Sequence, residues 1–223
     1  MDAWNADDER AAARFPGPDY LAVLGWLHED LQPAVYVEIG VHYGASLRLA
    51  APGTDTIGID PRPLVSTPGR IFAMTSATYF HRHAPPPFSL AFIDGEHLFE
   101  RSLADFRRLE RHAAPDALIA LHDTIPLDRT TAARRRTADF HTGDVWKTVA
   151  FLHHHRPDLR IATVRTAPTG LTLVRGLDPQ RARYRFTDVR RFARLGWDYW
   201  TAHQGEFLPT IPNHRASIQR FLQ

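Results

Sequence analysis

Acidic and imidazole side chains directly follow two apolar segments of this sequence. Asp94 and His97 come after one segment, and His122 and Asp123 come after another. Because the carboxyl ends of parallel strands meet at one edge of a sheet, these four side chains are expected to face the same crevice. An imidazole can take a proton from a hydroxyl group, and carboxylates can hold a divalent metal ion. For His97 the alternative of capping the helix that follows stays open.

A second candidate site surrounds two glycines, Gly40 and Gly44. The β-branched segment 35–39 ends at Gly40, which can adopt the positive φ of a sharp turn from strand to helix. A dinucleotide site needs a further glycine, and a phosphate loop needs a Lys-Ser or Lys-Thr pair; both are missing. Glu38 instead places a carboxylate before the turn, which favours a cationic ligand. An ordinary strand-to-helix turn is the alternative.

Asp60 ends the next apolar segment, 56–59, and Pro61 fixes the chain as it leaves. The side chain is expected at the same sheet edge as Glu38, where a carboxylate can accept hydrogen bonds from two ribose hydroxyls. Capping the turn that follows is an equally good interpretation.

The periodicity of the apolar residues predicts the elements that position these side chains. Strands are predicted at 35–39, 56–59, 70–74, 89–93, 117–121, 159–164 and 170–174. Helices are predicted at 19–31 with Asp19 as N-cap, at 46–51, at 98–112 and after Asp144 as N-cap. This order predicts an α/β fold of the Rossmann-like, doubly wound type, with a mostly parallel seven-stranded sheet and helices on both faces.

The chain divides into three predicted parts. Residues 1–32 form an N-terminal helical segment, 33–176 form the ligand-binding domain, and 177–223 form an aromatic-rich extension. The basic stretch 123–143 lacks periodicity and is long for a connection, as lid loops often are, with a mobile surface loop as the alternative. The aromatic content of the extension favours packing against the domain or against a second copy in a homodimer.

Composition excludes several classes of protein. The 27 basic and 25 acidic residues nearly cancel, which argues against a nucleic-acid partner. Because the chain has no cysteine, it has no disulfide and no thiolate metal site. The acidic N-terminus is not a signal peptide, and no apolar run is long enough to span a membrane, so a cytoplasmic protein without a membrane partner is expected.

From residue 36 to 174, the order of these motifs resembles the class I S-adenosylmethionine (SAM)-dependent methyltransferases. The resemblance implies that the turn from Glu38 to Ser46 holds the methionine part of SAM, that Asp60 binds the ribose and that the residues after the third strand frame the adenine. The carboxylates of Glu38 and Asp94 would attract the cationic groups of SAM. The implied cofactor-binding residues are Glu38, Gly40, Gly44, Ser46, Asp60, Thr75, Ser76 and Asp94.

The segments around Asp94 and Asp123 are similar to those of metal-dependent small-molecule O-methyltransferases, including the macrocin and mycinamicin sugar methyltransferases. The resemblance implies that Asp94 and Asp123 bind Mg²⁺ and that His97 deprotonates a hydroxyl of a sugar or glycosylated natural product. His122 stands where that family has an acid, so it is a candidate ligand for another divalent metal or a second candidate base. The expected catalytic residues are therefore His97 and His122, and the expected metal ligands are Asp94, Asp123 and His122.

Two other functions fit the same motifs. The arginines of 134–136 and 181–194 favour a methyltransferase that modifies nucleic acid, although the near-neutral charge argues against it. His122 favours a scaffold that binds SAM without catalysis. A small-molecule acceptor is the expected partner.

Overall fold

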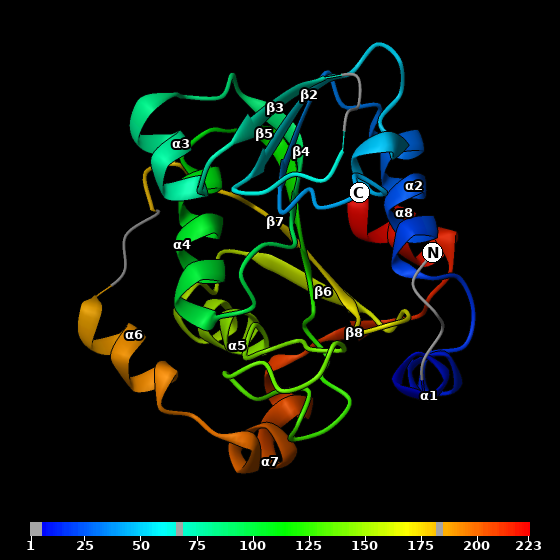
Figure 1. Ribbon diagram of the computed structural model, residues 1–223, viewed down its shortest axis with the longest axis vertical. Coiled ribbons are helices and arrows are strands. Elements are labelled where there is room, and N and C mark those ends of the chain that lie inside the picture. The colour runs from blue at the N-terminus through cyan, green and yellow to red at the C-terminus, as the bar shows by residue number, and fades with distance from the viewer. Residues whose placement is uncertain (1–5, 66–68, 182–184) are drawn as a thin grey trace.

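A single twisted sheet of eight strands forms the centre of the molecule, in the order β3-β2-β1-β4-β5-β7-β6-β8 (Figure 1). The computed structural model describes residues 6–65, 69–181 and 185–223. The strands are β1 (Val35–Ile39), β2 (Asp55–Asp60), β3 (Arg70–Ala73), β4 (Phe88–Ile93), β5 (Ala113–His122), β6 (Arg160–Val164), β7 (Leu171–Arg175) and β8 (Thr210–Ile211). Strands β1 to β5 pair in parallel, whereas β7 is antiparallel to both β5 and β6. The predicted α/β fold with a mostly parallel sheet is confirmed.

The number of strands was predicted wrongly, because the sheet has eight strands rather than seven. The additional strand β8 belongs to the C-terminal extension and pairs in parallel with Thr163 and Val164 of β6. It contains only two residues and therefore gives no alternating pattern that the sequence could reveal. The extension thus completes the sheet.

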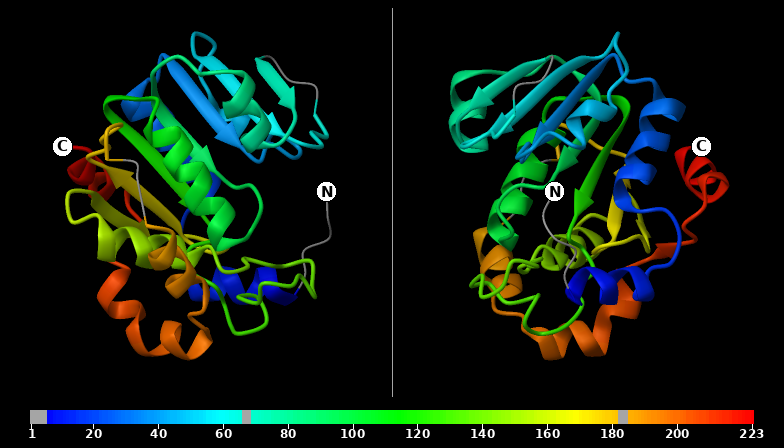
Figure 2. Two further views of the ribbon diagram at one scale, coloured as in Figure 1. Left: turned by 90° about the vertical axis from the view of Figure 1, so that its left-hand side faces the viewer. Right: turned by 45° about the vertical axis from the view of Figure 1, so that its right-hand side comes forward.

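Helices cover both faces of the sheet, as predicted (Figure 2). They are α1 (Ala6–Arg14), α2 (Tyr20–Leu31), the 3₁₀ helix η1 (Leu47–Leu49), α3 (Ser76–Arg82), α4 (Phe99–Glu110), α5 (Trp146–His155), α6 (Phe186–Ala193), α7 (Trp197–Phe207) and α8 (Arg215–Leu222). Alternate residues of β1 point to opposite faces: Val37 packs in the core with α4 and α5, and Tyr36 packs in the core with α2. Both cores are formed by the bodies of the strands, and the polar residues follow at the carboxyl ends of the strands.

Local structure differs from the prediction at the first glycine turn and at α5. The helix predicted at 46–51 is only the single turn η1, which ends ahead of Pro52. Asp19 caps α2 as predicted, with its Oδ1 accepting the Ala22 N–H at 2.9 Å. Asp144 does not cap α5; its Oδ1 accepts the N–H of Phe99 at 2.8 Å and so caps α4. Because Asp144 and Phe99 are distant in sequence, no local sequence pattern predicts this cap.

Several aromatic residues of the extension pack inside this chain. Trp200 and Phe207 of α7 are buried against Trp146 of α5, at ring-centroid distances of 5.5 and 5.8 Å. Phe186 is exposed, and Tyr184 lies outside the described residues. Packing within the chain accounts for part of the aromatic content, and the homodimer stays a prediction. None of the described helices is long and apolar enough to cross a membrane.

Candidate active site

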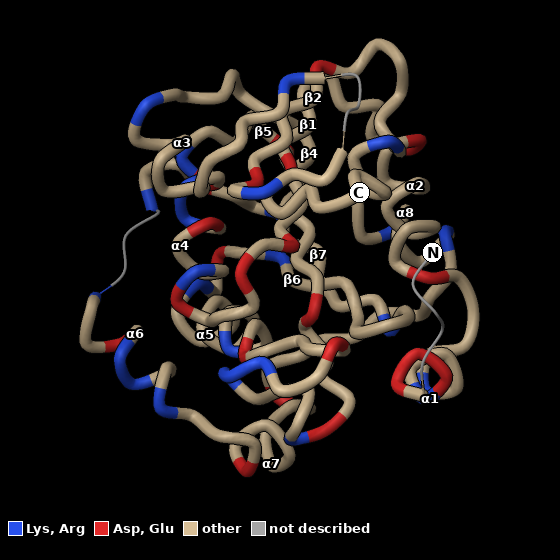
Figure 3. Tube along the Cα trace, in the orientation of Figure 1, with Lys and Arg blue, Asp and Glu red and all other residues tan. Residues whose placement is uncertain are grey.

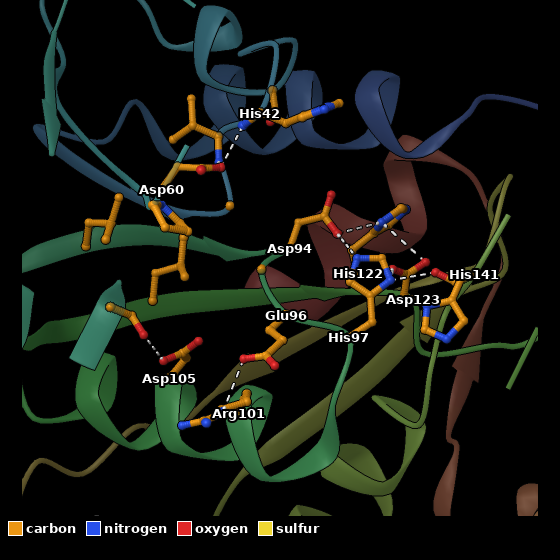
Figure 4. A pocket seen from close by; sticks show the side chains of 18 of the residues that line it. His42, Asp60, Asp94, Glu96, His97, Arg101, Asp105, His122, Asp123 and His141 are labelled. Atoms are coloured by element: carbon orange, nitrogen blue, oxygen red, sulfur yellow. Dashed lines mark hydrogen bonds and ion pairs between the residues drawn. The ribbon is translucent and has the colours of Figure 1, made fainter. Parts of the chain in front are cut away.

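A cavity of about 870 Å³ opens at the carboxyl ends of β1, β2, β4 and β5 (Figure 4). It lies where the strand order reverses between β1 and β4, the usual place for a ligand in an open α/β sheet. Most of the predicted site residues line it: Gly40, Ser46, Asp60, Thr75, Ser76, Asp94, His97, His122 and Asp123. Glu38 and Gly44 are not among the lining residues.

Gly40 brings the turns after β1 and β4 into direct contact. Its φ is +92°, and a Cβ atom at this position would lie 2.0 Å from the carbonyl oxygen of Asp94. The Asp94 N–H donates to the Ile39 carbonyl at 2.8 Å, which fixes the two turns side by side. Only glycine fits this close backbone approach without a shift of the main chain.

Glu38 supports the turn from below the cavity. The side chain is fully buried and accepts hydrogen bonds from the Tyr36 hydroxyl at 2.6 Å and the Ser46 hydroxyl at 2.8 Å. Burial raises the pKa of Glu38 to about 8, despite the opposing effect of these two hydrogen bonds. The carboxyl group is therefore largely neutral at pH 7, and its evident task is to hold Ser46 at the cavity wall.

Asp60 caps the turn that follows it and lies at the cavity wall, and its binding of a ribose stays a prediction. One carboxylate oxygen accepts the backbone N–H groups of Val41 and His42, each at 2.9 Å. The other accepts the N–H of Arg62 at 2.6 Å, as expected of an acid that caps the following turn. Asp60 also lines the cavity, so it is placed to meet a ligand while fixing the glycine turn.

Thr75 and Ser76 begin α3 at the cavity wall. Thr75 caps this helix, accepting the Thr78 N–H at 3.2 Å, and the Ser76 hydroxyl donates to Asp105 at 2.5 Å. Asp105 also lines the cavity, and sequence reasoning missed it because it lies in the middle of a helix. Helix α4 thus adds an acid to the cavity wall beside Ser76.

Asp94, His97 and Asp123 form a compact group, with one potential ligand atom from each residue within 4.8 Å of the others. Two carboxylates and an imidazole suit a divalent transition metal, whereas Mg²⁺ favours oxygen ligands alone. His122 was predicted as a ligand but is not a member of this group. Its Nδ1 lies 3.2 Å from Asp94 Oδ1 instead, on the side where it neutralises the carboxylate.

His97 is held by the loop that precedes α5. Its Nδ1 lies 2.5 Å from the carbonyl oxygen of His141 and 3.1 Å from Asp123 Oδ2. Two oxygen acceptors at Nδ1 place the proton on that nitrogen, which leaves the lone pair on Nε2. Burial alone would lower the pKa of His97, but the charges of Asp123 and Asp94 outweigh it and raise that pKa. His97 makes no side-chain hydrogen bond that caps α4.

His122 is buried beside the carboxylates of Asp94 and Asp123. Burial opposes its protonation, but the charges of Asp94 and Asp123 prevail and raise the pKa of His122 to about 9. Burial likewise opposes ionisation of Asp94, while the His122 charge holds the pKa of Asp94 below its usual value. At neutral pH the residues form an imidazolium–carboxylate pair that keeps the site nearly neutral.

Asp123 adopts a strained backbone conformation, with φ at +60°. Its Oδ1 accepts the hydroxyl of Thr169 at 2.6 Å, so the loop between β6 and β7 fixes the carboxylate. Non-glycine residues in this region of φ and ψ occur often at functional sites. The strain therefore agrees with the prediction that Asp123 acts in the site.

Two parts of the cavity wall were not predicted from the sequence. Tyr20, the first residue of α2, lies with its ring 4.1 Å from that of His122 and lines the cavity. Burial, together with the charge of Asp94, raises the pKa of Tyr20, so its hydroxyl stays protonated. The only local signal was the N-cap Asp19, which places the residue after it at a helix start.

The loop predicted as a lid supplies the other part. Arg136, Asp139, Phe140 and His141 line the cavity, and no regular helix or strand spans residues 125–143. Gly143, with φ at +57°, lies so close to the His97 carbonyl that a Cβ atom would be 1.8 Å from that oxygen. The loop therefore closes against His97 itself.

Comparison with known proteins identifies the fold. Residues 37–124 match the family model described as a methyltransferase domain, which covers less than half of the chain. No curated protein matches the chain. Cofactor-bound Rv0187 from MTB is 18% identical, with a TM-score of 0.57 over 78% of this chain and 88% of that one.

Two further solved structures have the same fold. The O-methyltransferase from Bacillus cereus in complex with S-adenosylhomocysteine (SAH) is 14% identical, with a TM-score of 0.52 over 78% of this chain and 92% of that one. The SAH-bound Podospora anserina methyltransferase PaMTH1 is also 14% identical, with a TM-score of 0.54 over 78% of this chain and 88% of that one. The Rossmann-like methyltransferase fold expected from the motifs is thereby confirmed, and the match over residues 37–124 supports the methyltransferase class of enzyme.

Proposed function

We propose that this protein transfers a methyl group from SAM to a hydroxyl group of a small molecule, such as a sugar or a glycosylated natural product. The observation that carries the proposal is a single cavity that joins the glycine turn and Asp60 to the group Asp94, His97 and Asp123. The methyltransferase domain match and the similarity to SAH-bound folds support SAM as the donor.

The residues around the glycine turn fit a nucleoside with a cationic side group. Ser46 and the turn at Gly40 would hold the methionine part, Asp60 would accept the ribose hydroxyls, and Ser76 would frame the base. SAM supplies a methyl group on a positively charged sulfur, which leaves as a neutral thioether once the methyl has moved. Asp94 is ionised but paired with His122, and it lies at the side of the cavity where His97 lies.

His97 is the proposed base. Because its Nδ1 proton is engaged by the His141 carbonyl and Asp123, its Nε2 is the nitrogen free to accept the hydroxyl proton. The acceptor oxygen then forms its bond to the methyl carbon as the carbon–sulfur bond breaks. Positioning of these atoms within the cavity closed by the loop 125–143 supplies a further part of the rate.

Asp94 and Asp123 would hold a divalent metal ion beside this base. Such an ion lowers the pKa of a hydroxyl group and orients it. His97 cannot bind the ion and accept the proton with the same nitrogen, so we assign the ion to the carboxylates. The His122 proton competes with the metal for Asp94, which predicts tighter metal binding as the pH rises through about 9.

Titration calorimetry with SAH tests the donor site. Asp60→Asn should weaken SAH binding, because it removes the charge that the glycine turn and the ribose share. Asp55→Asn is the matched control, since Asp55 lies at the opposite end of the same strand and pairs with Arg70 at 2.6 Å. SAH binding that is absent, or equally affected by both substitutions, would contradict the proposal.

Addition of Mn²⁺ and then Mg²⁺ to the SAH complex tests the metal. We expect a separate heat for Mn²⁺ that Asp94→Asn abolishes. SAH binding without any metal heat would favour a metal-free reaction in which the imidazolium of His122 takes the place of the ion beside Asp94. SAH binding without turnover of any hydroxyl acceptor would instead favour the scaffold function.

A methyltransferase acting on nucleic acid is the remaining alternative. Arg134 is engaged inside the molecule, with Asp144 and Glu100 at 2.5 and 3.0 Å, and is therefore a poor candidate for phosphate contacts. Filter binding of single-stranded and duplex nucleic acid at low salt tests this function. Retention that falls steeply with salt would support it over the small-molecule acceptor.

A further inference from the structure

A second cavity of about 630 Å³ is lined in part by the segment that leads from α1 into α2. Three stretches of chain that are distant in sequence form it: residues 14–18 after α1, Arg165 after β6, and residues 210–214 from β8 to the start of α8. It shares no lining residue with the candidate active site. Its volume is in the range of small-molecule sites.

The lining of this cavity is cationic. Arg14, Arg165 and His214 line it, and no carboxylate does among the described residues. The two guanidinium groups flank the buried ring of Phe15, at 5.2 and 5.4 Å from its centroid. Two positive charges held beside one ring repel each other, and an anion bound near both would offset this repulsion.

The nearby negative charges are already engaged. Asp128 is the acid that most influences Arg14, and it pairs with Arg10 at 2.7 Å and accepts the Thr131 N–H at 2.9 Å. Burial, followed by the charges of Arg165 and Arg10, lowers the pKa of Arg14. Arg165 is exposed and pairs with no carboxylate in the part of the chain that the structure describes. Figure 3 shows acidic residues on α1, which ends at the cavity, and at many other places along the chain.

The walls of the cavity are fixed before any ligand binds. The Pro18 carbonyl accepts the Asn213 amide N–H at 2.8 Å and the Thr166 hydroxyl at 2.7 Å, which ties the three stretches together. Arg14 Nη1 donates to the carbonyls of Pro126 and Leu127 at 3.0 and 2.9 Å, so its side chain is held in place. A preformed site loses little conformational entropy when a ligand binds.

We propose that this cavity binds the phosphate group of a phosphorylated small molecule, held by Arg14 and Arg165. Arginine is suited to this task because its planar fork of N–H donors matches phosphate oxygens. The helix α8 begins at Arg215, directly after His214, so the positive end of its helix dipole lies beside the cavity lining.

Inorganic phosphate is the probe for this site, titrated into the full chain by calorimetry at constant ionic strength with chloride as the exchanged anion. Arg165→Gln should weaken phosphate binding about tenfold or more, since one of two charged donors is lost. Arg160→Gln is the matched control, because Arg160 is exposed and also lies 5.4 Å from an aromatic centroid, that of Phe221, but does not line the cavity. Arg165→Lys, which keeps the charge, should recover part of the affinity.

Amide chemical shifts locate the binding. Phosphate should shift the signals of residues 14–18 and 210–214 and leave those of Gly40, Asp94 and His97 unchanged. No phosphate heat in the wild type, equal weakening by Arg165→Gln and Arg160→Gln, or shifts confined to the active-site signals would each overturn the proposal. The experiment uses neither SAM nor an acceptor, so its result does not depend on the proposed methyl transfer.

Discussion

The two halves of the candidate active site satisfy their carboxylates by different means. In the glycine-turn half, which comprises Glu38, Gly40, Ser46 and Asp60, the carboxylates accept hydrogen bonds from backbone N–H groups and hydroxyls. In the histidine half, which comprises Asp94, His97, His122 and Asp123, the carboxylates lie against two imidazoles. The first set of donors has a fixed charge, whereas the second gains or loses protons.

This difference suggests that the glycine-turn half fixes the geometry of the site and the histidine half carries out the reaction. The donors of the glycine-turn half do not titrate near neutral pH, although the Glu38 carboxyl that accepts two of their hydrogen bonds has a pKa raised to about 8. The imidazoles of the histidine half respond to pH, to a metal ion and to a substrate proton, as a reacting site requires. Substitutions in the glycine-turn half should therefore change the stability of the fold and the affinity for SAM. Substitutions in the histidine half should change the rate of turnover and its pH dependence.

The largest effect is expected on turnover, in the histidine half. His97→Asn places an amide nitrogen near the position of Nδ1, which preserves the bond to the His141 carbonyl, and removes Nε2. Turnover with a hydroxyl acceptor should fall about 10²- to 10⁴-fold, as for loss of a general base, while SAH affinity stays unchanged. Steady-state kinetics and SAH calorimetry measure the two quantities. His153→Gln, at an exposed position on α5, is the control; turnover of His97→Asn near the wild-type rate would end the proposed role.

The next effect is expected on stability, in the glycine-turn half. Gly40→Ala should lower the free energy of unfolding by about 3 kcal/mol, because the new Cβ meets the Asp94 carbonyl and the positive φ is strained. Denaturant unfolding measures this change. Gly53→Ala, where no atom lies within 4 Å and φ is not positive, should change stability by less than about 0.5 kcal/mol. Similar losses for both variants would remove the distinction that we draw.

A pH-dependent effect should follow in the histidine half. The pKa of His122 is about 9 in the folded chain and near 6.5 in the unfolded chain, so its stabilising contribution is complete below about pH 6.5 and is lost as the pH rises through about 9. The shift corresponds to at most about 3 kcal/mol. His122→Gln should therefore lower stability at pH 6 and converge with the wild type above pH 9. Unfolding in the presence of a chelator measures this, and parallel stability curves would contradict it.

The smallest effect is expected where the loop 125–143 meets the histidine half. Arg134→Met removes one partner of the buried Asp144, which retains Lys147 at 2.8 Å. Because Arg134 is partly exposed, the loss of stability should not exceed about 1 kcal/mol. Amide hydrogen exchange at His141 and Thr142 should accelerate. Arg129→Met, which breaks the exposed pair with Asp198, is the control and should leave exchange at these positions unchanged.

Sequence patterns predicted the strands that carry the site and failed at contacts between distant segments. The turn after β1 was readable because Glu38 and Gly40 interrupt an apolar run at a fixed spacing. The sequence did not predict three features: the cap of α4 by Asp144, the strand β8, and the position of Asp105 at the cavity wall. Each of these depends on where a helix or loop far along the chain is placed.

The sequence by itself determined the α/β order, the sheet edge that carries the acids and the methyltransferase character of the motifs. Local periodicity and turn chemistry are sufficient for the first two, because parallel strands bring their carboxyl ends together. The methyltransferase character came from the resemblance of the motifs to a known family. Only the tertiary structure decided that His97 forms a potential metal-binding group with Asp94 and Asp123 while His122 Nδ1 lies 3.2 and 3.6 Å from the same two carboxylates, and that Tyr20 lies over His122. These choices depend on ring orientation within a few ångströms, which is set by packing across the whole fold and not by spacing along the chain.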